Sequence, residues 1–157
     1  MLTLLGINLN TVPVLDVRRK FTNKIIGDRS FSSSPKIVSK LGDYSISKYH
    51  KHHIGTIIKH IPGHGLALVD SHKKLPVVNA NANEIYKKDF KAFVNKKSLF
   101  AMTAHILYKN IDKHNCATHS KKIINLIRKK IGFKNLKSMA GGIEEWSKKI
   151  DSSVPRY

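Results

Sequence analysis

The chain has 157 residues, a length typical of one domain with room for a hydrophobic core. Its formal net charge is +19, because 29 lysines and arginines stand against 10 aspartates and glutamates, and such a field attracts polyanions such as RNA, acidic proteins or anionic membrane surfaces. No apolar run approaches the roughly 20 residues of a membrane-spanning helix, and the single cysteine excludes an internal disulfide.

The first 34 residues have the composition of a mitochondrial transit peptide. Residues 1–15 carry no charged side chain, five basic residues follow, and the run Arg29-Ser30-Phe31-Ser32-Ser33 is similar to a matrix-processing site. Asp16 and Asp28 are unusual in such a segment, and the alternative is a core strand over residues 11–19. We predict a targeting segment over residues 1–34 and a location in the mitochondrial matrix, with a cytoplasmic location as the alternative.

The middle of the chain alternates between strand-like and helix-like segments. Short β-branched runs broken by glycine predict strands and loops over residues 35–60, followed by a turn at Pro62-Gly63-His64-Gly65. Three further segments are expected from their apolar spacing: a buried parallel strand at 66–70, a short extended piece at 75–79 and a helix within 80–94. The apolar run at 100–108 fits either a strand or a buried helix.

The last third shows a clearer pattern. Isoleucines at 3.6-residue spacing and lysines on the opposite face predict an amphipathic helix over residues 120–131, ended by Gly132. A short strand is expected at 135–139, and Gly142 begins a second helix that holds the only tryptophan. Strands and helices in alternation predict an α/β fold with a small parallel sheet.

This C-terminal pattern resembles the second half of a rhodanese-like (sulfurtransferase) domain. A cysteine precedes a helix, and Gly132-Phe133 and Gly141-Gly142 lead to Trp146 near the chain end, most like the rhodanese domains fused to E1-like activating enzymes of sulfur-carrier proteins. The resemblance is specific over residues 114–157, and we extend the expected domain to residues 35–157. It implies a three-layer α/β fold with a small parallel sheet flanked by helices.

The resemblance also implies a site around the cysteine. In this family a cysteine thiolate at a helix N-terminus accepts sulfur as a persulfide, because the backbone N–H groups and the helix dipole stabilise the thiolate. Cys116 would be this nucleophile. Among its neighbours, Thr118, His119 and Ser120 would line the loop and cap the helix. The substrate would be bound by His114, Lys121 and Lys122. No glycine or arginine lies between Cys116 and Ser120, so a catalytically degenerate member is the alternative.

The function expected from the resemblance is sulfur transfer without a cofactor. The sulfur donor would be thiosulfate or a persulfide, and the acceptor a thiol or a sulfur-carrier protein. The charge supports a different class, a non-catalytic RNA- or ribosome-associated mitochondrial protein whose lysines contact phosphates and whose aromatic residues stack on bases. Five histidines between residues 50 and 64 lack regular ligand spacing, so no metal site is predicted.

Overall fold

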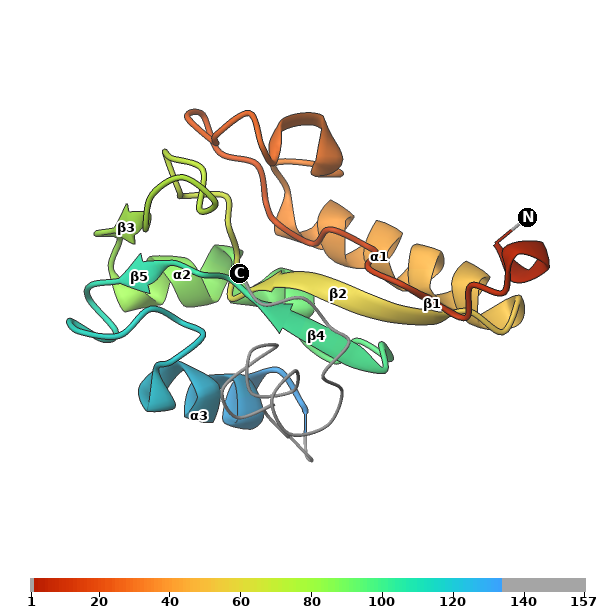
Figure 1. Cartoon of the computed structure of the whole chain (residues 1–157). Helices are drawn as coiled ribbons and strands as arrows, with labels where there is room; N and C mark the ends of the chain where they lie inside the picture. The colour runs from red at the N-terminus through yellow and green to blue at the C-terminus, as the bar shows by residue number, and fades with distance from the viewer. Residues whose placement is uncertain (1, 134–157) are drawn as a thin grey trace, which may run out of the picture.

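The computed structural model describes residues 2–133, and its centre is a parallel sheet (Figure 1). The sheet has the strand order β1-β2-β4, and a second, two-stranded parallel sheet pairs β3 with β5. The strand bounds are Leu9–Asn10 for β1, Gly55–Ile61 for β2, Val77–Val78 for β3, Phe100–Thr103 for β4 and Leu107–Tyr108 for β5. Residues far apart in the chain thus meet at the carboxyl ends of neighbouring parallel strands.

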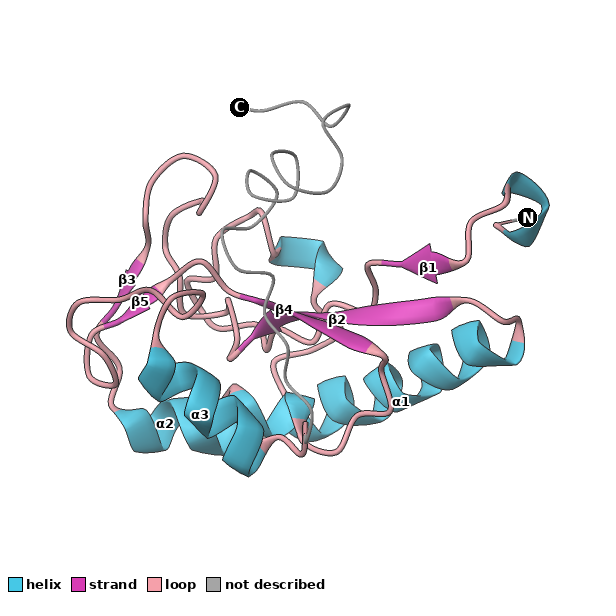
Figure 2. Ribbon diagram, turned by 60° about the horizontal axis from the view of Figure 1, so that its bottom comes forward, coloured by secondary structure: helices cyan, strands magenta, loops and turns pink. Residues whose placement is uncertain are grey.

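The α-helices lie along one side of the strands, as the turned view shows (Figure 2). They are α1 over Pro35–Lys51, α2 over Ala82–Lys88 and α3 over Lys121–Lys130, with 3-10 turns at Thr3–Leu5, Gly27–Arg29 and Phe90–Phe93. No helix within residues 2–133 combines the length and the apolar character needed to cross a membrane.

Helix α1 begins with Pro35 in its first turn, where the missing N–H costs nothing. Val38, Gly42 and Ile46 recur every four residues and form its buried face. A Cβ at Gly42 would collide with Leu15, so the glycine permits this close approach. The prediction of short strands over residues 35–60 was therefore wrong for the first two thirds, because the apolar spacing, and not the β-branched content, decides the structure.

Strand β2 is the central strand, and its side chains are buried or half-buried along the whole length. The pairing of β2 with β4 shifts register between Lys59 and Ile61, so His60 has no partner in the ladder. Such an irregularity re-aims a side chain and releases a backbone N–H for another acceptor.

The segment before α1 belongs to the same fold. β1 pairs with β2, Val14 forms an isolated bridge to Lys59, and Leu15 and Val17 are fully buried in the core. The prediction that residues 1–34 direct mitochondrial import stays a prediction.

The other elements follow the sequence more closely. The helix expected within residues 80–94 corresponds to α2 and the 3-10 turn after it, and the helix expected at 120–131 to α3. The run at 100–108 contains two strands, whereas residues 66–70 form a loop and not the predicted strand. The predicted strand at 135–139 and the tryptophan helix lie outside the described residues. A mixed α/β fold with small parallel sheets and helices is confirmed.

Candidate functional site

The carboxyl end of β2 leads into a buried turn, Pro62-Gly63-His64-Gly65. The extended backbone of residues 14–17 runs beside this turn, and a Cβ at Gly65 would collide with the carbonyl oxygen of Val17. Glycine at this position therefore allows two backbone segments to touch. In parallel α/β folds, functional side chains gather at this edge of the sheet.

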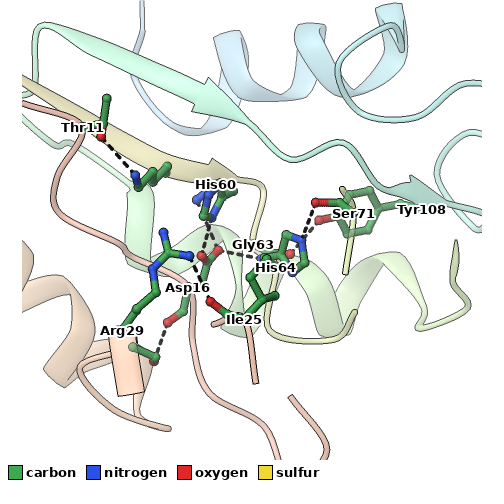
Figure 3. A network of polar contacts seen from close by, with 11 residues as sticks. Thr11, Asp16, Ile25, Arg29, His60, Gly63, His64, Ser71 and Tyr108 are labelled. Atoms are coloured by element: carbon green, nitrogen blue, oxygen red, sulfur yellow. Dashed lines mark hydrogen bonds and ion pairs between the residues drawn. The ribbon is translucent and has the colours of Figure 1, made fainter. Parts of the chain in front are cut away.

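The turn is held by the carboxylate of Asp16, which is fully buried (Figure 3). Its Oδ1 accepts the backbone N–H of His60 at 3.2 Å and that of His64 at 2.6 Å, and its Oδ2 lies 2.7 Å from the His60 Nδ1. The His60 N–H is available because the register shift removes it from the β-ladder. A buried charge is tolerated only when it is well hydrogen-bonded, and these three donors meet that need.

Two further hydrogen bonds fix the same region. The buried Tyr108 hydroxyl donates to the carbonyl of Gly63 at 2.6 Å, and the Ser30 hydroxyl donates to the backbone carbonyl of Asp16 at 2.7 Å. Burial raises the pKa of Tyr108 well above its usual value, so the phenol remains a donor across the physiological pH range. We call the set of Asp16, His60, His64, Gly63 and Tyr108 the Asp16 clamp.

Basic side chains lie next to the clamp. Lys59 precedes His60 in β2, and its Nζ donates to the Thr11 hydroxyl at 3.2 Å. Burial lowers the pKa of Lys59, and the positive charge of Arg29 nearby lowers it further. Arg29 and Lys59 both line a hollow of about 370 Å³. Two cationic donors therefore converge beside a buried carboxylate.

An exposed histidine–carboxylate pair lies in the loop after the turn. Asp70 Oδ1 accepts the backbone N–H of His72 at 2.9 Å and lies 2.8 Å from the His72 Nδ1. These contacts, the backbone one first, lower the pKa of Asp70. The His72 side chain is 80% exposed and that of Asp70 23%, so the imidazole faces solvent on a fixed carboxylate.

This pair is tethered to the clamp. The Nε2 of buried His64 lies 3.3 Å from the hydroxyl of Ser71, the residue between Asp70 and His72 (Figure 3). Burial lowers the pKa of His64, which favours its neutral form. A continuous series of polar contacts thus connects the buried Asp16 with the exposed His72 loop.

The residues predicted from the resemblance lie in and beside the loop before α3. Cys116 is buried, and its Sγ lies 3.5 Å from the Nδ1 of His105. Ser120 is the N-cap of α3, since its hydroxyl accepts the Ile123 N–H. The hydroxyl oxygens of Thr118 and Thr103 lie 3.3 Å apart. The remaining predicted residues are exposed: His114, His119, Lys121 and Lys122.

Sequence reasoning missed the site at the carboxyl end of β2. Its signal was the run from Lys59 to Gly65, in which a basic pair precedes a Pro-Gly-His-Gly turn, followed by Asp70-Ser71-His72. Asp16, far away in the chain, could be linked to this run only through the tertiary structure.

Comparisons with known proteins identify the family of the chain. The model of the glycosyl hydrolase family 3 N-terminal domain matches residues 2–136. The beta-hexosaminidase A of Pseudoalteromonas piscicida is 32% identical over 98% of the chain and 29% of its own length. The solved structure of NagZ from Neisseria gonorrhoeae in complex with N-trifluoroacetyl-D-glucosamine has a TM-score of 0.80 and 31% identity over 94% of the chain and 45% of its own.

A family 3 beta-N-acetylglucosaminidase from Paenibacillus superposes with a TM-score of 0.79 and 30% identity, over 84% of the chain and 26% of its own length. The matched relatives are thus glycoside hydrolases of known fold. The chain belongs to the glycosyl hydrolase family 3 N-terminal domain family, and it spans less than half the length of each of these relatives.

This membership corrects the rhodanese resemblance and what followed from it. The family match covers residues 2–136, and the solved neighbours are glycoside hydrolases, so neither the three-layer rhodanese-like arrangement nor the sulfurtransferase function is supported. The RNA- or ribosome-associated alternative is overturned by the same match. The prediction of thiosulfate, persulfides and sulfur-carrier proteins as partners was wrong, because the homologues are glycoside hydrolases, which act on carbohydrates.

The predicted site residues rested on that resemblance. A persulfide site was predicted at Cys116, Thr118, His119 and Ser120, and substrate binding at His114, Lys121 and Lys122. The family match removes the basis of these roles, and no contact in the structure tests them. Ser120 does cap α3, as expected of its type.

The loop before α3 is organised by Asp112. Its Oδ1 accepts the backbone N–H groups of His114 and Asn115 at 3.1 and 3.2 Å, and its Oδ2 accepts the Ser120 hydroxyl at 2.6 Å. These hydrogen bonds, that of Ser120 first, hold the pKa of Asp112 far below its usual value. The folded state therefore favours the ionised carboxylate.

We predict a pH-dependent cost for Asp112→Asn. Because the folded pKa lies below the unfolded value of 3.8, the contribution of Asp112 to the free energy of unfolding is complete above pH 3.8. It is lost progressively as the pH falls from there toward and through the folded pKa. Urea unfolding should show a clear difference between wild type and variant at pH 7 that shrinks by pH 3. The exposed Asp28 offers the control Asp28→Asn; a difference for Asp112→Asn that is constant with pH would contradict the assignment.

Proposed function

We propose that the chain supplies the sugar-binding edge and the proton donor of a glycoside hydrolase that acts on β-linked N-acetylhexosamine residues. The observation that carries the proposal is the exposed Asp70–His72 pair, tethered through Ser71 and His64 to the Asp16 clamp. The substrate class is supported by the relatives, which are named as beta-hexosaminidase and beta-N-acetylglucosaminidase and include a complex with N-trifluoroacetyl-D-glucosamine.

Sugar binding is assigned to the basic groups beside the clamp. Lys59 and Arg29 line one hollow and are donors without acceptor capacity, which suits the lone pairs of sugar hydroxyls and of an acetamido carbonyl. Hydrogen bonds from ionised donors are about twice as strong as neutral ones. The His60 ring, fixed at Nδ1 by Asp16, offers its Nε2 as a further polar contact.

Proton transfer is assigned to His72. With Nδ1 turned to Asp70, the Nε2 faces solvent and is free to protonate the oxygen of the leaving sugar. A neighbouring carboxylate orients an imidazole and fixes which ring nitrogen faces the substrate. Glycosidases ordinarily use a carboxylic acid for this step, and a histidine–carboxylate pair can perform it near neutral pH.

Glycoside hydrolysis also needs a second group, a nucleophile or a base on the other side of the sugar. Within residues 2–133 we assign no carboxylate to this role: Asp16 is engaged by three donors, and the buried Asp89 pairs with Arg19 at 2.6 Å. The arrangement is compatible with a segment of a TIM-like barrel, in which side chains from several strand ends complete one site.

We expect N-trifluoroacetyl-D-glucosamine to bind at this edge. Its ¹⁹F signal should broaden with the wild-type chain and sharpen again when excess N-acetyl-D-glucosamine competes. Lys59→Met keeps the apolar stem but removes the charged donor, so it should reduce the broadening markedly. Lys51→Met at the exposed end of α1 is the matched control and should behave as wild type. Absence of broadening, or equal broadening by Lys59→Met, would contradict the assignment of the binding edge.

The role of His72 predicts a dependence on the leaving group. Hydrolysis of N,N′-diacetylchitobiose requires protonation of a poor leaving group, so His72→Ala should lower its kcat by roughly 100-fold or more. The 4-nitrophenyl N-acetyl-β-D-glucosaminide should be affected much less, because nitrophenolate leaves without a proton. His53→Ala, at an exposed site after α1, is the control.

Equal losses on the two substrates would exclude His72 as the proton donor. If the wild-type chain hydrolyses neither substrate, its proposed role is limited to sugar binding.

A further inference from the structure

A second group of side chains converges where the segment after β4 meets the loop that precedes α3. Cys116, His105 and His119 each present one ligand atom, and these atoms all lie within 4.8 Å of one another. The Cys116 Sγ lies 3.5 Å from the Nδ1 of His105. The rings of His105 and His119 stand edge to face, with centroids 6.0 Å apart at an angle of 87°. We call these three residues the Cys-His-His triad.

Two chain segments bring the triad together, and backbone contacts fix them. His105 follows β4, whereas Cys116 and His119 belong to the loop before α3. The Ala117 N–H donates to the carbonyl of Ile106 at 2.8 Å, which joins the two segments between the ligands. The Cys116 carbonyl accepts the N–H groups of both His119 and Ser120 at 2.9 Å. The loop therefore holds the triad without help from a bound ion.

The exposure of the three residues suits the entry of an ion. Cys116 is buried with 7% of its surface exposed, while both histidines are exposed. The thiol thus forms the floor of the group, and the two imidazoles lie at its solvent side.

We propose that the Cys-His-His triad is a zinc-binding site. Thiolate and imidazole are the ligands that Zn²⁺ takes most often, at about 2.3 Å to sulfur and about 2.0–2.1 Å to nitrogen. Tetrahedral geometry with these bond lengths places sulfur and nitrogen about 3.6 Å apart, close to the 3.5 Å between Cys116 and His105. The ligand atoms of the triad lie up to 4.8 Å apart, and rotation of the exposed imidazoles would shorten these distances to those of a zinc site. The fourth position is left to water.

The proposal is separate from the sugar site and from nonspecific attraction of cations. None of the three ligands belongs to the Asp16 clamp or to the Asp70–His72 pair. The net charge of +19 repels cations in general, so retained zinc would reflect coordination and not electrostatic attraction. On binding, Zn²⁺ displaces the thiol proton to solvent and no redox change is involved.

The test is metal binding by the full chain. Titration with Zn²⁺ against a chromophoric chelator should show one tight equivalent, and Co²⁺ in its place should give a near-ultraviolet thiolate-to-cobalt charge-transfer band. Zn²⁺ should also protect Cys116 from alkylation by iodoacetamide, read by mass spectrometry. Loss of a group that only hydrogen-bonds to a metal ligand weakens metal sites by about 10–100-fold. Loss of a ligand should cost more, so His119→Ala should weaken binding by about 100-fold or more, and Cys116→Ala should abolish the charge-transfer band.

Controls come from histidines outside the triad. His114→Ala lies in the same loop, and His72→Ala removes the other histidine held by a fixed partner; both should retain the tight equivalent. Because His105 and His119 are exposed, their alanine variants keep the proposal testable if Cys116→Ala does not fold. Absence of a tight equivalent, binding unchanged in His105→Ala and His119→Ala, or binding lost in His72→Ala would each overturn the site.

Discussion

The site depends on the hydrogen bonds that the carboxylate of Asp16 accepts. This carboxylate is fully buried, and its desolvation is offset by two backbone N–H groups and one imidazole, all from the carboxyl end of β2. Removing such an acceptor would leave buried donors unpaired, at about 1–3 kcal/mol each. Two local features allow the contact: the register shift that releases the His60 N–H, and Gly65, which admits the backbone of Val17.

A series of polar contacts leads from this buried carboxylate to the exposed imidazole of His72. Asp16 fixes His64, His64 contacts Ser71, and Ser71 lies between the members of the exposed Asp70–His72 pair. Rigid groups near the core are combined with a solvent-facing imidazole in a loop, an arrangement that suits binding at the clamp and proton transfer at the surface. In the Cys-His-His triad, His105 follows β4, and Cys116 and His119 lie in the loop ordered by the independent contacts of Asp112.

The sequence predicted what local periodicity determines. The isoleucine spacing located α3, and Ser120 lies where a cap was expected. The site was missed because its parts are far apart: Asp16 meets His60 across 44 positions, which no short motif records. Two sequence patterns led to wrong predictions. The β-branched residues of α1 obscured its four-residue spacing, and the C-terminal motif resembled another family although residues 2–136 match the family 3 N-terminal domain.

The central claim is that the Asp16 clamp shapes the edge that binds the sugar. Its most direct test is the dissociation constant for N-acetyl-D-glucosamine of Asp16→Asn, compared with wild type in samples whose circular dichroism spectra agree. Asparagine has nearly the same size as aspartate but lacks the charge and one of the two acceptor oxygens that hold the His60 and His64 donors. We predict binding weaker by about tenfold or more, as expected for the loss of one charged hydrogen bond. Equal affinity in the two proteins would contradict the account.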